Sequence, residues 1–78
     1  MTDGERLALD RAAWHAARTA HYLRELHATK RAQEPVSPAL MALEDAAHDA
    51  ARSYHELIAA GAKPPLRGAP CPEEKSFA

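Results

Sequence analysis

The sequence is poor in the residues that build β-sheets, disulfides and membrane spans. It contains one valine, one isoleucine and three glycines, a composition that argues against a sheet and its turns. Its one cysteine cannot form a disulfide within the chain. Apolar runs of only a few residues exclude a transmembrane helix, and the charges spread over residues 1–30 argue against a signal peptide. We therefore expect a helical, cytoplasmic protein without membrane contact.

Alanine dominates what is present. It supplies 19 of the 78 residues and more than half of the 46% hydrophobic content, so helix formation is favoured while little apolar surface can be buried. The formal charge of -1 gives the whole chain no strong electrostatic bias. A single domain of this size buries only about 60% of its unfolded surface, which makes a core of its own marginal.

Local signals divide the chain into two helices and a tail. Thr2 and Glu5 have the spacing of a capping box, and no helix-breaking residue follows until Pro35. Ser37 and the proline after it form a second start signal, and Gly61 is suited to end the second helix. We predict helices over about 3–33 and 38–60, a hairpin over 1–61, and a proline-rich tail over 62–78.

Apolar residues recur at steps of three and four in both helices, which predicts one packing seam on each. The first seam comprises Leu9, Ala12, Ala13, Ala16, Ala20, Leu23 and Leu26. The second comprises Leu40, Leu43, Ala47, Ala50, Tyr54 and Leu57. The short connection makes the helices antiparallel, with residue i roughly opposite residue 70 minus i. Net charges of +3 over 5–33 and -3 over 38–60 favour this pairing.

Two helices alone leave the flanks of both seams in water. So thin a core does not offset the entropy lost on folding. We therefore predict an all-α helical hairpin that associates with a second copy as a homodimeric four-helix bundle.

A second apolar strip runs along the first helix, on the side away from its seam. It contains Leu7 and Trp14, with Arg11 and Arg18 at its border and Tyr22 one turn further on. An exposed tryptophan with arginine neighbours is typical of the residues that dominate protein interfaces. These five residues are the predicted partner-binding site.

The tail offers another explanation for this strip. It holds four of the six prolines and has no periodicity, so by itself we expect it to be extended or disordered. Docking of the tail through Leu66 and Phe77, or the dimer itself, would also cover Trp14.

The histidines are candidates for metal binding. Asp45 and His48 are one helical turn apart, and the pairing rule sets His15 level with His55. Solvated histidines on the flanks of the seam are the simpler interpretation, so no cofactor is predicted. No nucleophile–base motif is visible, and Cys71 lies far from any helix end that would activate it. We expect no enzymatic activity.

The chain resembles the Rop family of small plasmid-encoded RNA-binding proteins. The matching positions are Met1, Thr2, Glu5, Ala8, Leu9, Ala12, Trp14, Thr19, Leu23, Leu26, Leu43, Asp45, Ala47, Arg52 and Ser53. The resemblance covers roughly 1–57 and implies helical hairpins that dimerise into an antiparallel four-helix bundle. The family binds paired RNA loops through one face of its first helices, where Trp14 would match an aromatic residue and Arg18 a polar contact. Acidic Asp3, Asp10 and Glu25 depart from that pattern, because they would repel phosphates.

The sequence thus predicts a small non-enzymatic adaptor or regulatory protein. Its partners would be a second copy of itself and an unidentified protein. The alternative is nucleic-acid binding by the first helix, through Arg11, Trp14, Arg18, Arg24 and Arg31. A second alternative is a metal-binding bundle that uses the histidines.

Overall fold

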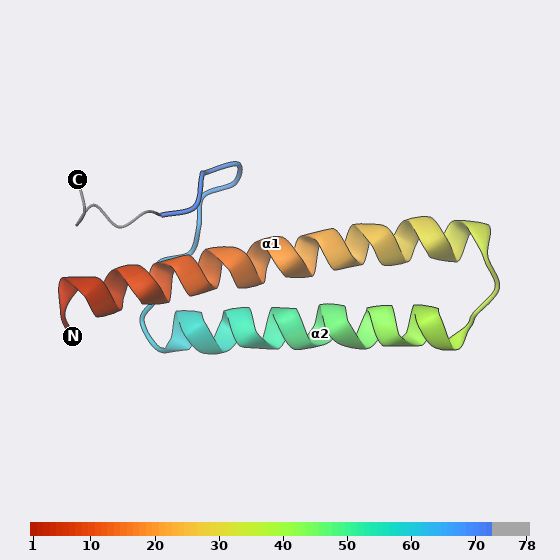
Figure 1. The fold of residues 1–78 in the computed structure, drawn as a ribbon, viewed down its shortest axis with the longest axis horizontal. Coiled ribbons are helices and arrows are strands. Elements are labelled where there is room, and N and C mark those ends of the chain that lie inside the picture. Colours follow the sequence, from red (N-terminus) through yellow and green to blue (C-terminus); the bar gives the residue numbers. More distant parts are fainter. Residues whose placement is uncertain (73–78) are drawn as a thin grey trace.

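The computed structural model describes residues 1–72, which form two antiparallel helices and a segment folded back on them (Figure 1). Helix α1 spans Asp3–Gln33 and helix α2 spans Pro38–Ala59, and residues 1–72 contain no strand. The predicted helical hairpin is confirmed, with helix ends within one residue of those expected. Within this described range, neither helix is long and apolar enough to cross a membrane. Phe77, considered above as a tail contact, lies outside the described residues.

Side chains cap the start of both helices as the sequence indicated. The Glu5 amide donates to Thr2 Oγ1 at 3.1 Å, and the Thr2 hydroxyl donates to Glu5 Oε1 at 3.2 Å. At the start of α2 the Leu40 amide donates to Ser37 Oγ at 3.3 Å. Each hydroxyl satisfies an amide that has no partner within its helix. Glu34, the residue before a proline, ends α1 in an extended conformation.

Glycine ends α2 and reverses the direction of the chain. Gly61 has φ 111°, and its amide donates to the carbonyl oxygen of Ile58 at 3.0 Å. The next amide, of Ala62, donates to the carbonyl oxygen of Leu57 at 3.0 Å. These two bonds form a Schellman motif, in which the positive φ is accessible to glycine without strain. The motif buries Ala62 and sends the following residues toward α1.

Gly61→Ala should lower the free energy of unfolding by about 1 kcal/mol, because a Cβ is disfavoured at positive φ. No atom lies within 4 Å of that Cβ, so the loss comes from the backbone alone. Gly4→Ala is the matched control: it lies in the first turn of α1 and its Cβ also has room, so we expect equal or somewhat higher stability, because alanine is the better helix former. Urea unfolding followed by circular dichroism measures both variants, and equal stabilities would contradict the assigned role of Gly61.

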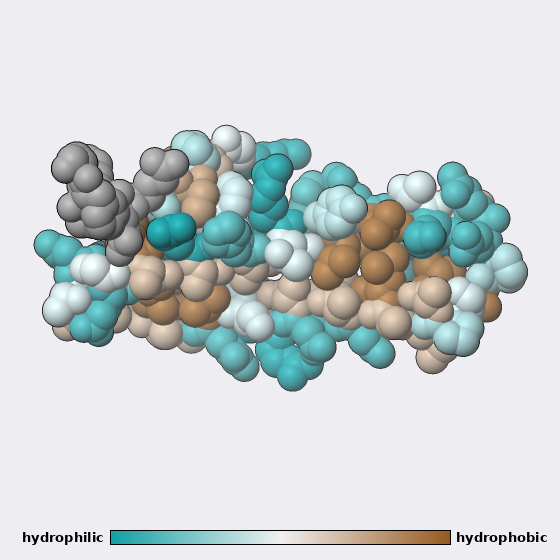
Figure 2. Space-filling view, viewed as in Figure 1, coloured by the Kyte–Doolittle hydropathy of each residue, from teal (hydrophilic) through white to brown (hydrophobic). Residues whose placement is uncertain are grey.

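Small residues form the buried core of the hairpin. The buried apolar residues in the described chain are Ala13, Ala20, Leu40, Ala47 and Ala62. Other large seam residues, such as Leu23 and Leu57, are only half-buried, and no large side chain is fully enclosed. Ala12 was expected in the seam but is exposed, because its neighbour Ala13 occupies the position facing α2. In the view of Figure 2, strongly hydrophobic residues reach the surface toward both ends, with weakly hydrophobic ones between them.

The two helices pair close to the expected register. His27 Nε2 lies 3.9 Å from Glu44 Oε2, one residue from the position that the pairing rule gives. This is the one ion pair between the helices in the described chain, and it forms only when the histidine is protonated. The opposite net charges of the helices therefore do not act through direct Lys or Arg contacts across the hairpin.

Candidate functional site

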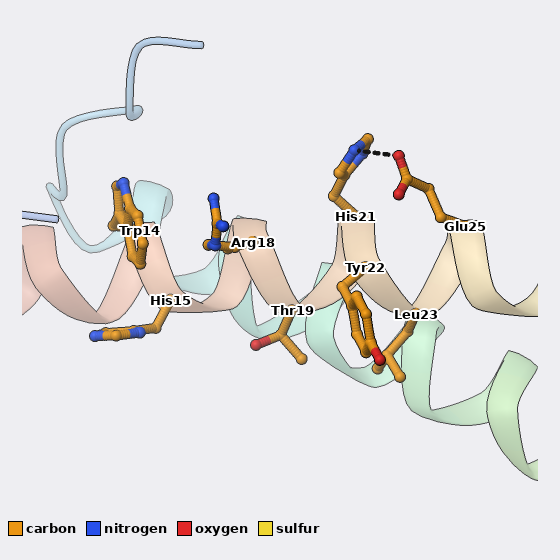
Figure 3. A pocket seen from close by; sticks show the side chains of 8 residues that line it. All are labelled: Trp14, His15, Arg18, Thr19, His21, Tyr22, Leu23 and Glu25. Carbon is orange, nitrogen blue, oxygen red and sulfur yellow. Dashed lines mark ion pairs between the residues drawn. The ribbon is translucent and has the colours of Figure 1, made fainter. Parts of the chain in front are cut away.

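Trp14 projects from the side of α1 that faces away from α2, toward the returning tail (Figure 3). Its indole Nε1–H donates to the carbonyl oxygen of Ala69 at 2.8 Å, in a partly buried position. This bond joins residues 55 positions apart in the sequence. The buried polar tip of the indole thus has a partner, as the N–H of a tryptophan normally requires.

Two neighbours on α1 fix the orientation of the indole. The guanidinium carbon of Arg18 lies 5.3 Å from the centre of the Trp14 ring, within the range of a cation–π interaction. The imidazole of His15 meets the same indole edge to face, with ring centres 5.0 Å apart and planes at 88°. Arg18 and His15 are both exposed, so both groups are accessible from solvent.

Three contacts bring the tail against α1. Besides the bond from Trp14, the backbone N–H of Lys63 donates to Asp10 Oδ1 at 2.8 Å. Further along, Cys71 Sγ lies 3.6 Å from His15 Nε2. Residues 62–72 are non-helical, as the prolines indicated; they cross α1 and form a loop on the side of α1 away from α2 (Figure 1). Contact of this segment with Trp14 agrees with the alternative that the tail covers the strip, although the contact is made by Ala69 and Leu66 is exposed.

The structure brings together only part of the predicted partner-binding strip. Trp14, Arg18 and Tyr22 line one open groove on α1, and the side chain of Tyr22 is 61% exposed. His21 lies in the same groove and pairs with Glu25 at 2.8 Å (Figure 3). The strip is therefore shorter than expected. Leu7 and Arg11 are half-buried and lie outside this groove.

Asp10 and Ala69 join the tail to α1, and the sequence did not predict either contact. Asp10 was considered only as an acid that would repel phosphates, whereas here it accepts the Lys63 amide. Ala69 contributes a backbone carbonyl, which no side-chain pattern reveals. The sequence held one indication of these contacts. Gly61 is suited to turn the chain back, and Trp14 lies within reach of the returning segment.

Cys71 and His15 form a thiol–imidazole pair that the sequence did not predict. A nucleophilic site uses such a pair to remove the thiol proton. Here the 3.6 Å separation is long, and the thiol has a second acceptor, the carbonyl oxygen of Pro72, also at 3.6 Å. The geometry is that of a contact that holds the tail against α1.

The proposed metal candidates are dispersed over the hairpin. His15 contacts Trp14 and Cys71, whereas His55 packs edge to face on Tyr54. His48 lies 3.8 Å from Glu44 on the same helix. Among residues 1–72, no three histidine, cysteine, aspartate or glutamate side chains gather closely enough to hold a metal ion. Asp45 is exposed and belongs to no such group.

The residues of the nucleic-acid alternative are also only partly available. Arg24 and Arg31 are exposed, while Arg11 is half-buried. Trp14 donates its indole N–H to the tail, and Arg18 lies near its ring. Stacking of a base on this tryptophan would therefore require the tail to move.

No protein-family model matches the chain, and comparisons with curated proteins and with solved structures find no significant match. The Rop-like resemblance consequently stays a prediction.

Proposed function

We propose that this chain is a non-enzymatic interaction protein that associates with a second copy of itself and presents the outer face of α1 to a partner. One observation carries the proposal: the hairpin buries almost nothing larger than alanine. Among residues 1–72, Leu40 is the only large apolar residue that is buried, and the other seam leucines are half-buried. A two-helix unit of this kind gains too little from its own packing to offset the entropy of ordering.

The shape of the molecule suits a second copy as the covering partner. The chain has a radius of gyration of 15.2 Å, against about 11.5 Å for a compact chain of its length. It exposes 5963 Å², against about 4,700 Å² for a compact protein of its mass, because the hairpin is slender and the tail adds surface. One long face measures 48 Å by 19 Å, which is large enough to give the about 800 Å² of accessible surface that each partner contributes to a stable interface.

Charge also favours association between copies. Basic residues predominate on α1, while α2 carries four acids and one arginine. An antiparallel copy that sets α1 against α2 of its partner brings opposite charges together at the rim. Such pairing also disfavours arrangements that set like helices side by side.

Measurement of absolute mass by light scattering tests the proposal. We expect twice the 8.5 kDa of the single chain, and a melting temperature that rises with protein concentration. Trp14→Ala is the control: it should leave mass and helicity unchanged, because Trp14 lies outside the interhelical core. A cooperatively melting 8.5 kDa species at tens of micromolar would overturn self-association. Dissociation or unfolding of the Trp14→Ala variant would show instead that Trp14 is part of the core.

A further inference from the structure

The buried alanines divide the hairpin into two long sides. Ala13 and Ala20 of α1 and Ala47 of α2 are buried where the helices meet. A helix turns by about 100° per residue, so residues three positions after a buried alanine lie on one flank, and residues four positions after it lie on the other. In an antiparallel hairpin the corresponding flanks of the two helices share one side of the molecule.

One of these sides is apolar on both helices. Its rows, in steps of seven residues, are Leu9, Ala16 and Leu23 on α1 and Leu43, Ala50 and Leu57 on α2. All six residues are half-buried, so each leaves apolar surface in water. The α1 row becomes polar only at Lys30, next to the loop. Figure 2 shows hydrophobic residues in a band along the line where α1 and α2 meet, bordered by hydrophilic residues. We call the six residues the apolar side.

The opposite side is mixed in character. Arg24, Glu44 and Ala51 line one hollow between the helices there. Charged residues make up four of the seven positions in the rows on this polar side, which comprise Asp10, Ala17, Arg24 and Arg31 on α1 and Glu44, Ala51 and Ile58 on α2. The two sides of the hairpin therefore differ strongly in what it costs to remove them from water.

The tail leaves the apolar side open. Its first bond to α1 runs from the Lys63 amide to Asp10, which belongs to the polar side. Within residues 1–72, the other polar contacts of the tail with α1 are made to Trp14 and His15, and neither residue belongs to the apolar side. The segment that covers part of α1 thus does not compete for this surface.

We propose that the apolar side is the surface through which two copies associate, with α1 of each copy against α2 of the other. This inference rests on the proposed self-association and names the surface that it uses. A twofold axis parallel to the helices brings the same six residues of both copies together, as a closed dimer requires. Each helix then runs antiparallel to the helix that it contacts, and Trp14 and the tail stay outside the interface.

Charge and spacing favour this pairing of helices. Residues 5–33 have a net charge of +3 and residues 38–60 a net charge of -3, so an arrangement with α1 against α1 would bring like charges together. The rows are also staggered, because residue i of α1 is level with about residue 70 minus i of α2. Leu23 of one copy is then level with the gap between Leu43 and Ala50 of the other. Side chains that are offset in this way interlock as knobs into holes.

Ala50→Glu and Ala51→Glu are a matched pair that tests the surface. The two alanines are adjacent and both half-buried, but they lie on opposite sides of the hairpin. A twofold interface buries the Ala50→Glu carboxylate twice, so the dissociation constant should rise at least about a hundredfold. Ala51→Glu places the same charge beside Arg24 at the open hollow, and it should dimerise like the wild type. Light scattering over a dilution series measures both variants.

Ala16→Gln and Ala17→Gln repeat the comparison on α1 without adding charge. These alanines are also adjacent and half-buried on opposite sides. We expect Ala16→Gln to weaken the dimer about tenfold, because its amide loses water in the interface, and Ala17→Gln to leave the dimer unchanged. This pair decides the question if Ala50→Glu does not fold.

The position of the two loops tests which helices face each other. An axis parallel to the helices places both loops at the same end of the dimer, whereas an axis that set α1 against α1 would place them at opposite ends. Val36 lies in the loop and is 75% exposed, so Val36→Cys combined with Cys71→Ser carries a spin label without disturbing the hairpin. Electron paramagnetic resonance should give a distance between the labels well below 48 Å, the length of the molecule.

The outcomes separate this inference from the self-association itself. A wild-type chain of 8.5 kDa at tens of micromolar overturns the self-association and the interface with it. A dimeric wild type whose paired variants dimerise equally, or whose Ala51→Glu and Ala17→Gln variants are the weaker ones, overturns the apolar side alone. Labels separated by nearly the length of the molecule overturn the pairing of α1 with α2.

Discussion

Leu40→Ala is expected to lower the free energy of unfolding by about 2–4 kcal/mol per chain, the usual loss when a buried leucine is truncated. Leu40 is 3% exposed and is the largest residue in the buried set, which otherwise consists of alanines. Domains of this length have about 4–12 kcal/mol of stability in total, so the loss is a large fraction. The melting temperature should fall by roughly 10–25 °C.

The adjacent residue provides the control. Met41 has a similar size but is 58% exposed, so Met41→Ala should change the stability by less than about 0.5 kcal/mol. Urea unfolding followed by circular dichroism, at one protein concentration, measures both variants. Equal losses for the two substitutions would mean that Leu40 is not the anchor of the core.

Ala13→Leu is expected to destabilise the hairpin by about 1–3 kcal/mol, although leucine is also a good helix former. Ala13 has no exposed surface and lies where α1 meets α2. Its small side chain lets the backbones of the two helices approach closely, and a leucine there must push the helices apart or leave its rotamer minimum. Half-buried leucines on both sides of the contact would then lose packing as well.

Ala28→Leu tests whether the larger volume of leucine destabilises α1 at any position or only at the contact with α2. Ala28 lies on the exposed face of the same helix, where the larger side chain has room, so its stability should stay within about 0.5 kcal/mol of the wild type. Thermal unfolding of both variants gives the comparison. A stabilised Ala13→Leu variant would show that the helices are separated by unfilled space.

The hairpin was predictable because its signals are local. Hydroxyl caps at Thr2 and Ser37, the break before Pro35 and the glycine at 61 each act within a few residues, and all lie where expected. The spacing did not fix which residue belongs to the α1 seam at Ala12 and Ala13. Ala12 and Ala13 are adjacent and identical, so spacing alone could not decide which of the two faces α2.

The site was only partly predictable because its decisive contacts are not local. The sequence singled out Trp14, Arg18 and Tyr22, which share a groove, but it also included Leu7 and Arg11, which do not. The acceptor for the indole is a backbone carbonyl 55 residues away. Every residue carries such a carbonyl, so hydrophobic periodicity could not point to Ala69.

The position of Trp14 also determines which structural change the tryptophan fluorescence of this protein measures. The single indole lies on the outer face of α1 and contacts the tail, so its emission changes when the tail departs, even where the helices remain folded. Far-ultraviolet ellipticity follows the helices themselves. Transitions recorded by the two methods need not coincide, and their disagreement would not be evidence for a partly folded intermediate of the hairpin.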